Sequence, residues 1–221
     1  MTKAFRIITA LLLSLLMLTA AAPVSFALDD NEISDWAKEE VEKAKDFGLI
    51  PDELLCDYRK GITREEFAVV MVRLFNKGDP HFPATDFEEP KDIAEIKNAE
   101  YTDAVRTALK YKLMTLDENG NFNPGKVMTR DEGARCLASL FFVCRRHGFK
   151  VGESGMLLKY RVEDYHECAR GGAWEVLYFI RVLKGVSEKR LAPQSIFTRE
   201  QCFVSALRFK RVIDGENYGD G

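Results

Sequence analysis

The string ITREE at residues 62–66 recurs as MTRDE at 128–132 and as FTREQ at 197–201. Each copy places a Thr three residues before a Glu or a Gln. The Thr hydroxyl can then accept a hydrogen bond from the N3 amide of a helix, while the N3 side chain returns to the cap. The sequence therefore predicts three capping boxes, formed by Thr63 with Glu66, Thr129 with Glu132, and Thr198 with Gln201.

Each capping box opens a stretch in which apolar residues recur at helical spacing. A second apolar stretch lies upstream of each box, and an aromatic residue stands near its start: Trp36, Tyr101 or Trp174. Turn signals separate the two stretches, namely GLIP at 48–51, NGNFNP at 119–124, and Gly185 with Pro193 in the third copy. The repeating unit is therefore a helix, a loop and a capped helix.

Units of this kind account for residues 28–78, 79–150 and 151–221, with linkers expected around 77–83 and 148–155. A lone unit cannot bury its apolar faces, whereas three copies packed around a common axis share one core. We expect a mainly α fold, in which three helix-loop-helix repeats form a pseudo-threefold spindle around a central helix bundle.

The first 27 residues have the pattern of a secretory signal peptide. A basic start precedes an unbroken apolar stretch at 7–18, and the small residues Ser25 and Ala27 suit cleavage after Ala27. The alternative is an uncleaved membrane anchor, which needs roughly 20 apolar residues, more than this stretch has. No later segment is apolar enough to span a bilayer. We expect a secreted chain with no membrane span after cleavage.

The composition limits which partners the chain can bind and which chemistry it can carry out. The net charge of -3 comes from 32 basic and 35 acidic residues mixed along the chain, so nucleic acid is not expected as a partner. The five cysteines have no metal-ligand spacing and mostly occupy apolar positions, so we expect buried thiols with room for one disulfide. They are Cys56, Cys136, Cys144, Cys168 and Cys202.

These motifs together resemble three S-layer homology repeats. The first unit is the closest, with SDWA at 34–37, GLI at 48–50 and ITREE at 62–66 in order. The second has Tyr101 where Trp is usual and KLM at 112–114 in place of the Gly turn, and the third keeps Asp164, Trp174 and Gly185. The resemblance implies attachment to pyruvylated secondary polysaccharide, and hence a place at the cell wall or surface of a bacterium.

Arg64, Arg130 and Arg199 directly follow the capping Thr residues. At N1 the first helical amides and the helix dipole favour an anion, and a guanidinium fork can bind a planar carboxylate through two hydrogen bonds. The resemblance places such sites in grooves between repeats, with Trp36, Tyr101 and Trp174 as candidates to stack on sugar. The alternative for each Arg is a solvated or ion-paired side chain, and for the aromatics a place in the core.

No catalytic, metal or cofactor site is expected. The chain has three His residues, and none lies in a zinc, nucleophile or phosphate-loop motif. The string DENGN at 117–121 resembles a calcium loop but lacks the closing Glu, so it is expected to be a turn.

Two functions fit these residues. The first is a non-catalytic surface module that binds anionic wall polysaccharide and anchors itself or another envelope protein. The second is a structural or protein-interaction module whose diverged repeats no longer bind glycan. An N1 Arg makes no required contact in its own helix, so replacing these arginines by Gln is expected to change stability by less than about 1 kcal/mol. Thr63→Ala is expected to cost roughly 1 kcal/mol.

Overall fold

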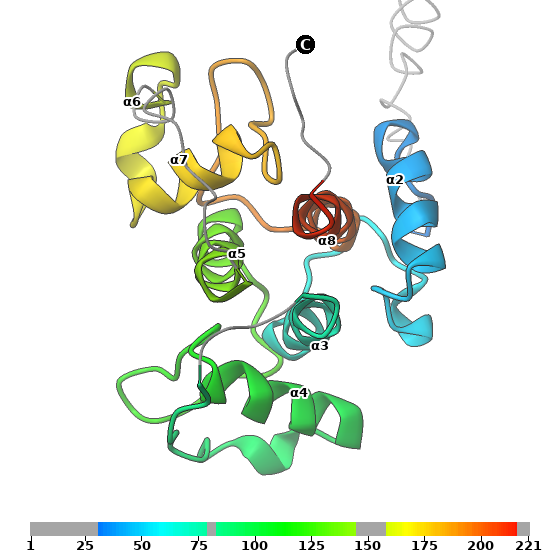
Figure 1. Cartoon of the computed structure of the whole chain (residues 1–221), viewed down its shortest axis with the longest axis vertical. Helices are drawn as coiled ribbons and strands as arrows, with labels where there is room; N and C mark the ends of the chain where they lie inside the picture. Colours follow the sequence, from blue (N-terminus) through cyan, green and yellow to red (C-terminus); the bar gives the residue numbers. More distant parts are fainter. Residues whose placement is uncertain (1–30, 79–82, 145–157, 216–221) are drawn as a thin grey trace, which may run out of the picture.

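The computed structural model describes residues 31–78, 83–144 and 158–215. The predicted signal peptide, part of the predicted linker at 77–83 and all of the predicted linker at 148–155 lie outside these residues. The mainly α class is confirmed (Figure 1). The helices are α2 (Asp35–Asp46), α3 (Arg64–Phe75), α4 (Ala99–Lys110), α5 (Arg130–Cys144), α6 (Leu158–Arg161), α7 (Gly171–Phe179) and α8 (Arg199–Ile213), with short 3-10 turns at Asp52–Leu54, Ile93–Glu95 and Tyr165–Glu167.

Within these three ranges, no helix combines the length and apolar character needed to cross a membrane.

The helices α3, α5 and α8 each begin immediately after a capping Thr. The Thr hydroxyl accepts from the N3 amide at 3.4 Å in α3, 3.2 Å in α5 and 3.3 Å in α8. The N3 side chain returns to the Thr amide at 3.0, 2.9 and 3.4 Å respectively. Two otherwise unpaired amides are thereby bonded at the start of each helix, which fixes where it begins.

The upstream helices α2, α4 and α7 are each followed by a residue with a left-handed backbone, two positions after the last helical residue. These residues are Gly48 (φ 68°), Lys112 (φ 54°) and Arg181 (φ 57°). The next amide returns to a carbonyl in the last turn each time: Leu49 to Ala44, Leu113 to Ala108 and Val182 to Leu177. Equivalent positions in the three units can therefore be counted from this residue.

This register corrects two expectations from the sequence. The turn residue of the third unit is Arg181, not Gly185. Counted from the turn residue, Trp36, Tyr101 and Trp174 are not equivalent to one another, because Tyr101 corresponds to Arg170 and Trp174 corresponds to Val105. Tyr101 and Trp174 are buried, whereas Trp36 is 54% exposed and lies outside the core.

Three hydrogen bonds form a closed cycle where the units meet. Ile62 donates its amide to Phe197 O at 2.9 Å, Phe197 donates to Met128 O at 2.9 Å, and Met128 donates to Ile62 O at 3.0 Å. The three side chains have no exposed surface. Each unit thus contributes the residue before its capping Thr to one shared centre.

Helix packing also runs from unit to unit. Figure 1 shows α3, α5 and α8 end-on in the middle of the molecule, with α2, α4 and α7 around them. The helix α4 packs on α3, α7 packs on α5, and α2 packs on α8. Each outer helix therefore covers the capped helix of the preceding unit, and the first unit covers the last.

The cysteines meet the expectation of buried thiols only in part. No disulfide joins them, Cys144 and Cys202 are buried, and Cys136 and Cys168 are half-buried. Cys56 is exposed, because it lies in the loop that precedes the first capping box rather than on a helix face.

Candidate binding pocket

The three predicted arginines occupy the N1 position of α3, α5 and α8, but their backbone amides are already bonded. Arg64 N–H donates to Lys126 O at 3.0 Å, Arg130 N–H to Ser195 O at 2.9 Å and Arg199 N–H to Lys60 O at 2.9 Å. The N2 amides donate to neighbouring carbonyls of the same loops. A loop of the next unit therefore occupies the position at the helix start where an anion was expected.

The guanidinium groups hold the same loops. Arg64 Nε donates to Phe122 O at 2.6 Å and its Nη2 donates to Thr115 O at 2.7 Å. Arg130 Nε and Nη2 donate to Leu191 O and Lys184 O at 3.0 and 2.8 Å. Because Gln cannot make these bonds, we now expect Arg→Gln at these positions to cost more than the roughly 1 kcal/mol expected from the sequence, most of all at Arg130, whose bond to Leu191 O is buried. The sequence alone did not indicate this role, because the acceptors lie more than fifty residues away.

The groove at Arg130 is sealed. Arg130 is 3% exposed, its guanidinium lies 5.5 Å from the centre of the Trp174 ring, and Nη1 donates to Gln201 Oε1 at 3.2 Å. Burial lowers the pKa of Arg130 to about 10. Trp174 donates its indole N–H to Asp131 Oδ1 at 3.0 Å and has no exposed surface. Neither residue presents a surface to a sugar.

The groove at Arg199 is closed by charge. Arg199 Nη2 lies 2.5 Å from Glu66 Oε1, and both side chains are 12% exposed. Its Nη1 donates to Cys56 O at 3.0 Å, and Asp57 Oδ2 lies 3.8 Å from the same nitrogen. Two carboxylates of the chain itself therefore neutralise this arginine.

The groove at Arg64 is open and forms a pocket of about 290 Å³. Its walls come from the start of α3, the loop of the second unit, α5 and the start of α7. The lining residues are Arg64, Lys112, Leu113, Met114, Thr115, Leu116, Asp117, Asn123, Lys126, Glu132, Arg135, Cys136, Ser139 and Arg170.

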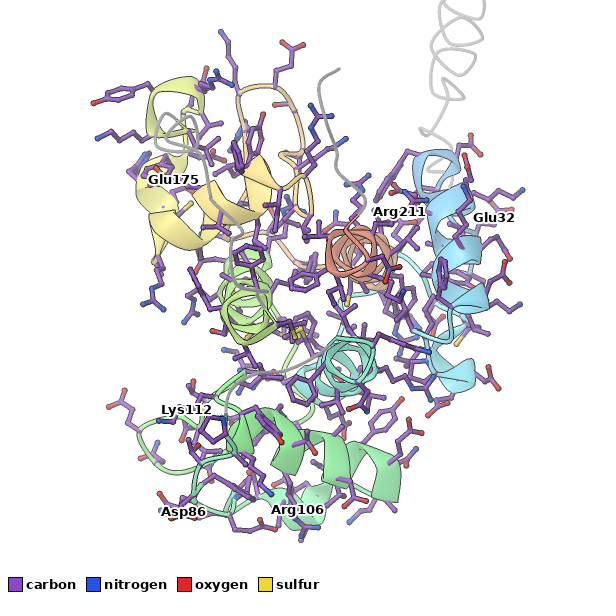
Figure 2. The ribbon with its side chains drawn as sticks, in the orientation of Figure 1. Glu32, Asp86, Arg106, Lys112, Glu175 and Arg211 are labelled. Atoms are coloured by element: carbon purple, nitrogen blue, oxygen red, sulfur yellow. The ribbon has the colours of Figure 1, made fainter. Side chains whose placement is uncertain are left out.

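Cations outnumber carboxylates in this pocket. Lys126 Nζ is paired with Glu132 at 2.7 Å, and Arg135 Nε is paired with Asp131 at 3.1 Å. Lys112 and Arg170 make no side-chain hydrogen bond or ion pair within the described part of the chain. Figure 2 shows Lys112 on the side of α4 that faces α5. Two unneutralised cations therefore border the pocket.

Arg64 lies between the loop and the open space. Its guanidinium carbon stands 4.6 Å from the centre of the Phe122 ring, and burial lowers its pKa. Nε and Nη2 hold loop carbonyls, while Nη1 donates to no residue within the described ranges. Nearby, burial raises the pKa of the Cys136 thiol to about 11, so this thiol is neutral at physiological pH. One N–H edge of Arg64 is thus left for a ligand.

The pocket contains one of the six predicted ligand-binding residues. Arg64 lines it, whereas Arg130, Arg199 and the three aromatics do not. Lys112, Lys126, Arg135 and Arg170 line it without having been predicted. For Lys112 a signal was present, because a Lys in place of the usual turn Gly puts a cation at the rim. Arg170 belongs to the third unit, and no local motif marks it.

The lining of this pocket comes mostly from the segment between the short turn at Ile93–Glu95 and the first turns of α5. Residues 91–133 match the S-layer homology domain. S-layer homology domains are non-catalytic modules that anchor proteins to the bacterial cell wall and bind its polysaccharide. The match implies association with the cell surface or wall. The match falls on the second unit, although the motifs of the first unit resemble the family more closely.

A longer stretch is similar to an endoglucanase of Bacillus sp. (strain KSM-635). The two are 22% identical over 138 residues, which is 60% of this chain and 15% of the endoglucanase. The chain therefore spans only a small part of this relative, and the similarity does not show that this chain is an enzyme.

Proposed function

We propose that the chain is a secreted, non-catalytic surface module that binds anionic, pyruvylated secondary polysaccharide of the bacterial cell wall. The pocket at Arg64 is the proposed site. The observation that carries the proposal is its charge: Arg64, Lys112, Lys126, Arg135 and Arg170 line it, against Asp117 and Glu132.

A pyruvate ketal suits this arrangement chemically. It presents one planar carboxylate on a sugar ring, and charge-assisted hydrogen bonds to a carboxylate are about twice as strong as neutral ones. Arg64 Nη1 supplies one donor, and Lys112 and Arg170 line the same pocket and add two further cations. The pocket's volume of about 290 Å³ suits a single terminal sugar.

The proposal includes the repeat architecture. Three units at 28–78, 79–150 and 151–221 form a pseudo-threefold spindle, with the signal peptide at 1–27 removed on export. The cyclic hydrogen bonds between Ile62, Phe197 and Met128 support this arrangement. So does the packing of each outer helix on the preceding unit. The module anchors itself or another envelope protein.

The test is co-sedimentation of residues 28–221 with sacculi that carry or lack the polysaccharide. The variant is Lys112→Gln with Arg170→Gln, because neither side chain holds the fold. The control is Lys38→Gln with Lys189→Gln, which removes two exposed cations away from the pocket. We expect the wild type and the control to pellet only with polysaccharide-bearing sacculi, and at least about tenfold weaker binding for the variant.

A specific observation favours the second candidate, a structural or protein-interaction module. Arg130 and Arg199 are committed to contacts within the chain, as a scaffold would require. If the folded wild type stays in solution with both kinds of sacculi, this second function replaces the first. If the variant pellets as well as the wild type, the glycan binds elsewhere than at the Arg64 pocket.

A further inference from the structure

The helix α5 is buried on all sides except along one stripe. Nine of its fifteen residues are buried. The other six recur at spacings of three or four residues, which places them on a single face of the helix. They are Glu132, Arg135, Cys136, Ser139, Phe142 and Val143.

The beginning of this stripe is a wall of the Arg64 pocket. The four residues of the stripe from Glu132 to Ser139 line the pocket. Phe142 follows Ser139 by three residues on the same face. At a rise of about 1.5 Å per residue, Phe142 lies about 4.5 Å along the helix from Ser139 and about 10 Å from Arg135. The wall of the pocket therefore leads directly to an aromatic side chain.

The ring of Phe142 is exposed and is also held in position. Phe142 is 49% exposed, whereas its neighbour Phe141 is 3% exposed. The two ring centres lie 5.7 Å apart and the ring planes cross at 73°, which is an edge-to-face contact. Because the core fixes the buried ring, this contact restricts the exposed one. Phe142 thus presents an ordered apolar surface next to the pocket.

The stripe changes in character along its length. Glu132 and Arg135 are charged, and both have partners within the chain. Beyond them no residue of the stripe carries a charge at physiological pH, because the Cys136 thiol is protonated. Ser139 is small, and its Oγ donates to Arg135 O at 3.1 Å, back toward the preceding turn. The charged end therefore passes into a neutral, apolar end at Phe142.

This change matches a sugar chain in which only one sugar is anionic. The pocket volume of about 290 Å³ suits a single sugar, so the next sugar of a bound chain must lie outside it. The faces of a sugar ring carry C–H groups, which are slightly positive because their carbons also bear oxygen. An aromatic ring has a negative face, so a sugar ring can lie flat against it.

We propose that Phe142 forms a second subsite of the Arg64 pocket and binds the neutral sugar next to the carboxylate-bearing one. The inference rests on the proposed function, because it extends the same site by one sugar. The carboxylate-bearing sugar lies at the start of α5 and its neighbour lies toward the end. Figure 1 shows α5 end-on between α4 and α7, so the sugar chain runs along the axis of view.

The experiment measures the affinity for two probes by calorimetry. The first probe is a methyl hexoside that carries a pyruvate ketal, and the second is the same sugar linked to one neutral hexose. The test variant is Phe142→Leu, which keeps an apolar side chain and removes the ring. Phe142→Tyr keeps the aromatic face. The matched control is Phe47→Leu, because Phe47 is 44% exposed and directly follows α2, which packs on α8.

We expect the wild type to bind the two-sugar probe about three- to tenfold more tightly than the one-sugar probe, which is the range that an aromatic contact contributes. Phe142→Leu should lose this gain and should bind the one-sugar probe as tightly as the wild type does. Phe142→Tyr and Phe47→Leu should keep the gain. Circular dichroism verifies that each variant is folded.

The two proposals fail in different ways. If the wild type binds both probes equally, or if Phe142→Leu keeps the gain, Phe142 is not a subsite while the Arg64 pocket stands. If folded Phe142→Leu weakens both probes to the same extent, its ring acts on the pocket as a whole and there is no second subsite. If the wild type binds neither probe, the proposed function itself is wrong.

Discussion

The side chain of Arg130 links the second unit to the third. Its guanidinium donates to Leu191 O, Lys184 O and Gln201 Oε1, all in the third unit. We expect Arg130→Gln to lower the free energy of unfolding by about 2 to 4 kcal/mol, because it removes the buried bond to Leu191 O together with the part-buried bonds to Lys184 O and Gln201. Urea denaturation, monitored by circular dichroism, measures this free energy. The control is Arg106→Gln on the outer face of α4 (Figure 2), whose exposed pair with Glu89 should contribute less than about 1 kcal/mol. Equal losses in the two variants would contradict the structural role of Arg130.

The sequence identifies these arginines but not what they contact. Their place after a capping Thr is local information, and it correctly puts Arg64, Arg130 and Arg199 at N1 of three helices. Their partners come from loops of other units, which no spacing rule relates to them. The same limit applies to Arg170, which reaches the pocket only because α7 packs on α5.

At the scale of elements, the capping boxes determine where the helices start. Thr63→Ala should lower the free energy of unfolding by about 1 kcal/mol, because the N3 amide of Glu66 loses its acceptor, the Thr63 hydroxyl. The reciprocal bond, from the amide of residue 63 to the Glu66 carboxylate, is then less well held in place. The control is Thr107→Ala within α4, whose hydroxyl makes no hydrogen bond among the described residues; Ala there should be neutral or slightly stabilising. Thermal melts of both variants measure the change in stability. A smaller loss of stability for Thr63→Ala than for Thr107→Ala would show that the capping box does not stabilise the fold.

Helix starts were predictable and helix ends were less so. A capping box requires particular side chains and can therefore be seen in the sequence. The left-handed residue after a helix requires only a backbone conformation, which several residue types can adopt. Gly48 fits the usual preference, but Lys112 and Arg181 adopt the same conformation at a cost of about 1 kcal/mol each. The packing of the following Leu113 and Val182, which are buried, outweighs that cost. This is why a search for Gly put the third turn at Gly185.

At the scale of the molecule, no unit contains its own core. The helix α4 of the second unit packs on α3 of the first, and α5 of the second unit is covered by α7 of the third. We therefore expect the isolated fragment 83–144 to be largely unfolded, with less than about half the helicity per residue of the fragment 31–215, since short helices without tertiary packing are marginal in water. Circular dichroism and thermal melts of the two fragments measure this. The longer fragment should unfold in one cooperative transition. The second unit carries the S-layer homology match. A cooperative melt of 83–144 alone would mean that this unit is an independent domain. The packing between units would then not be required for it to fold.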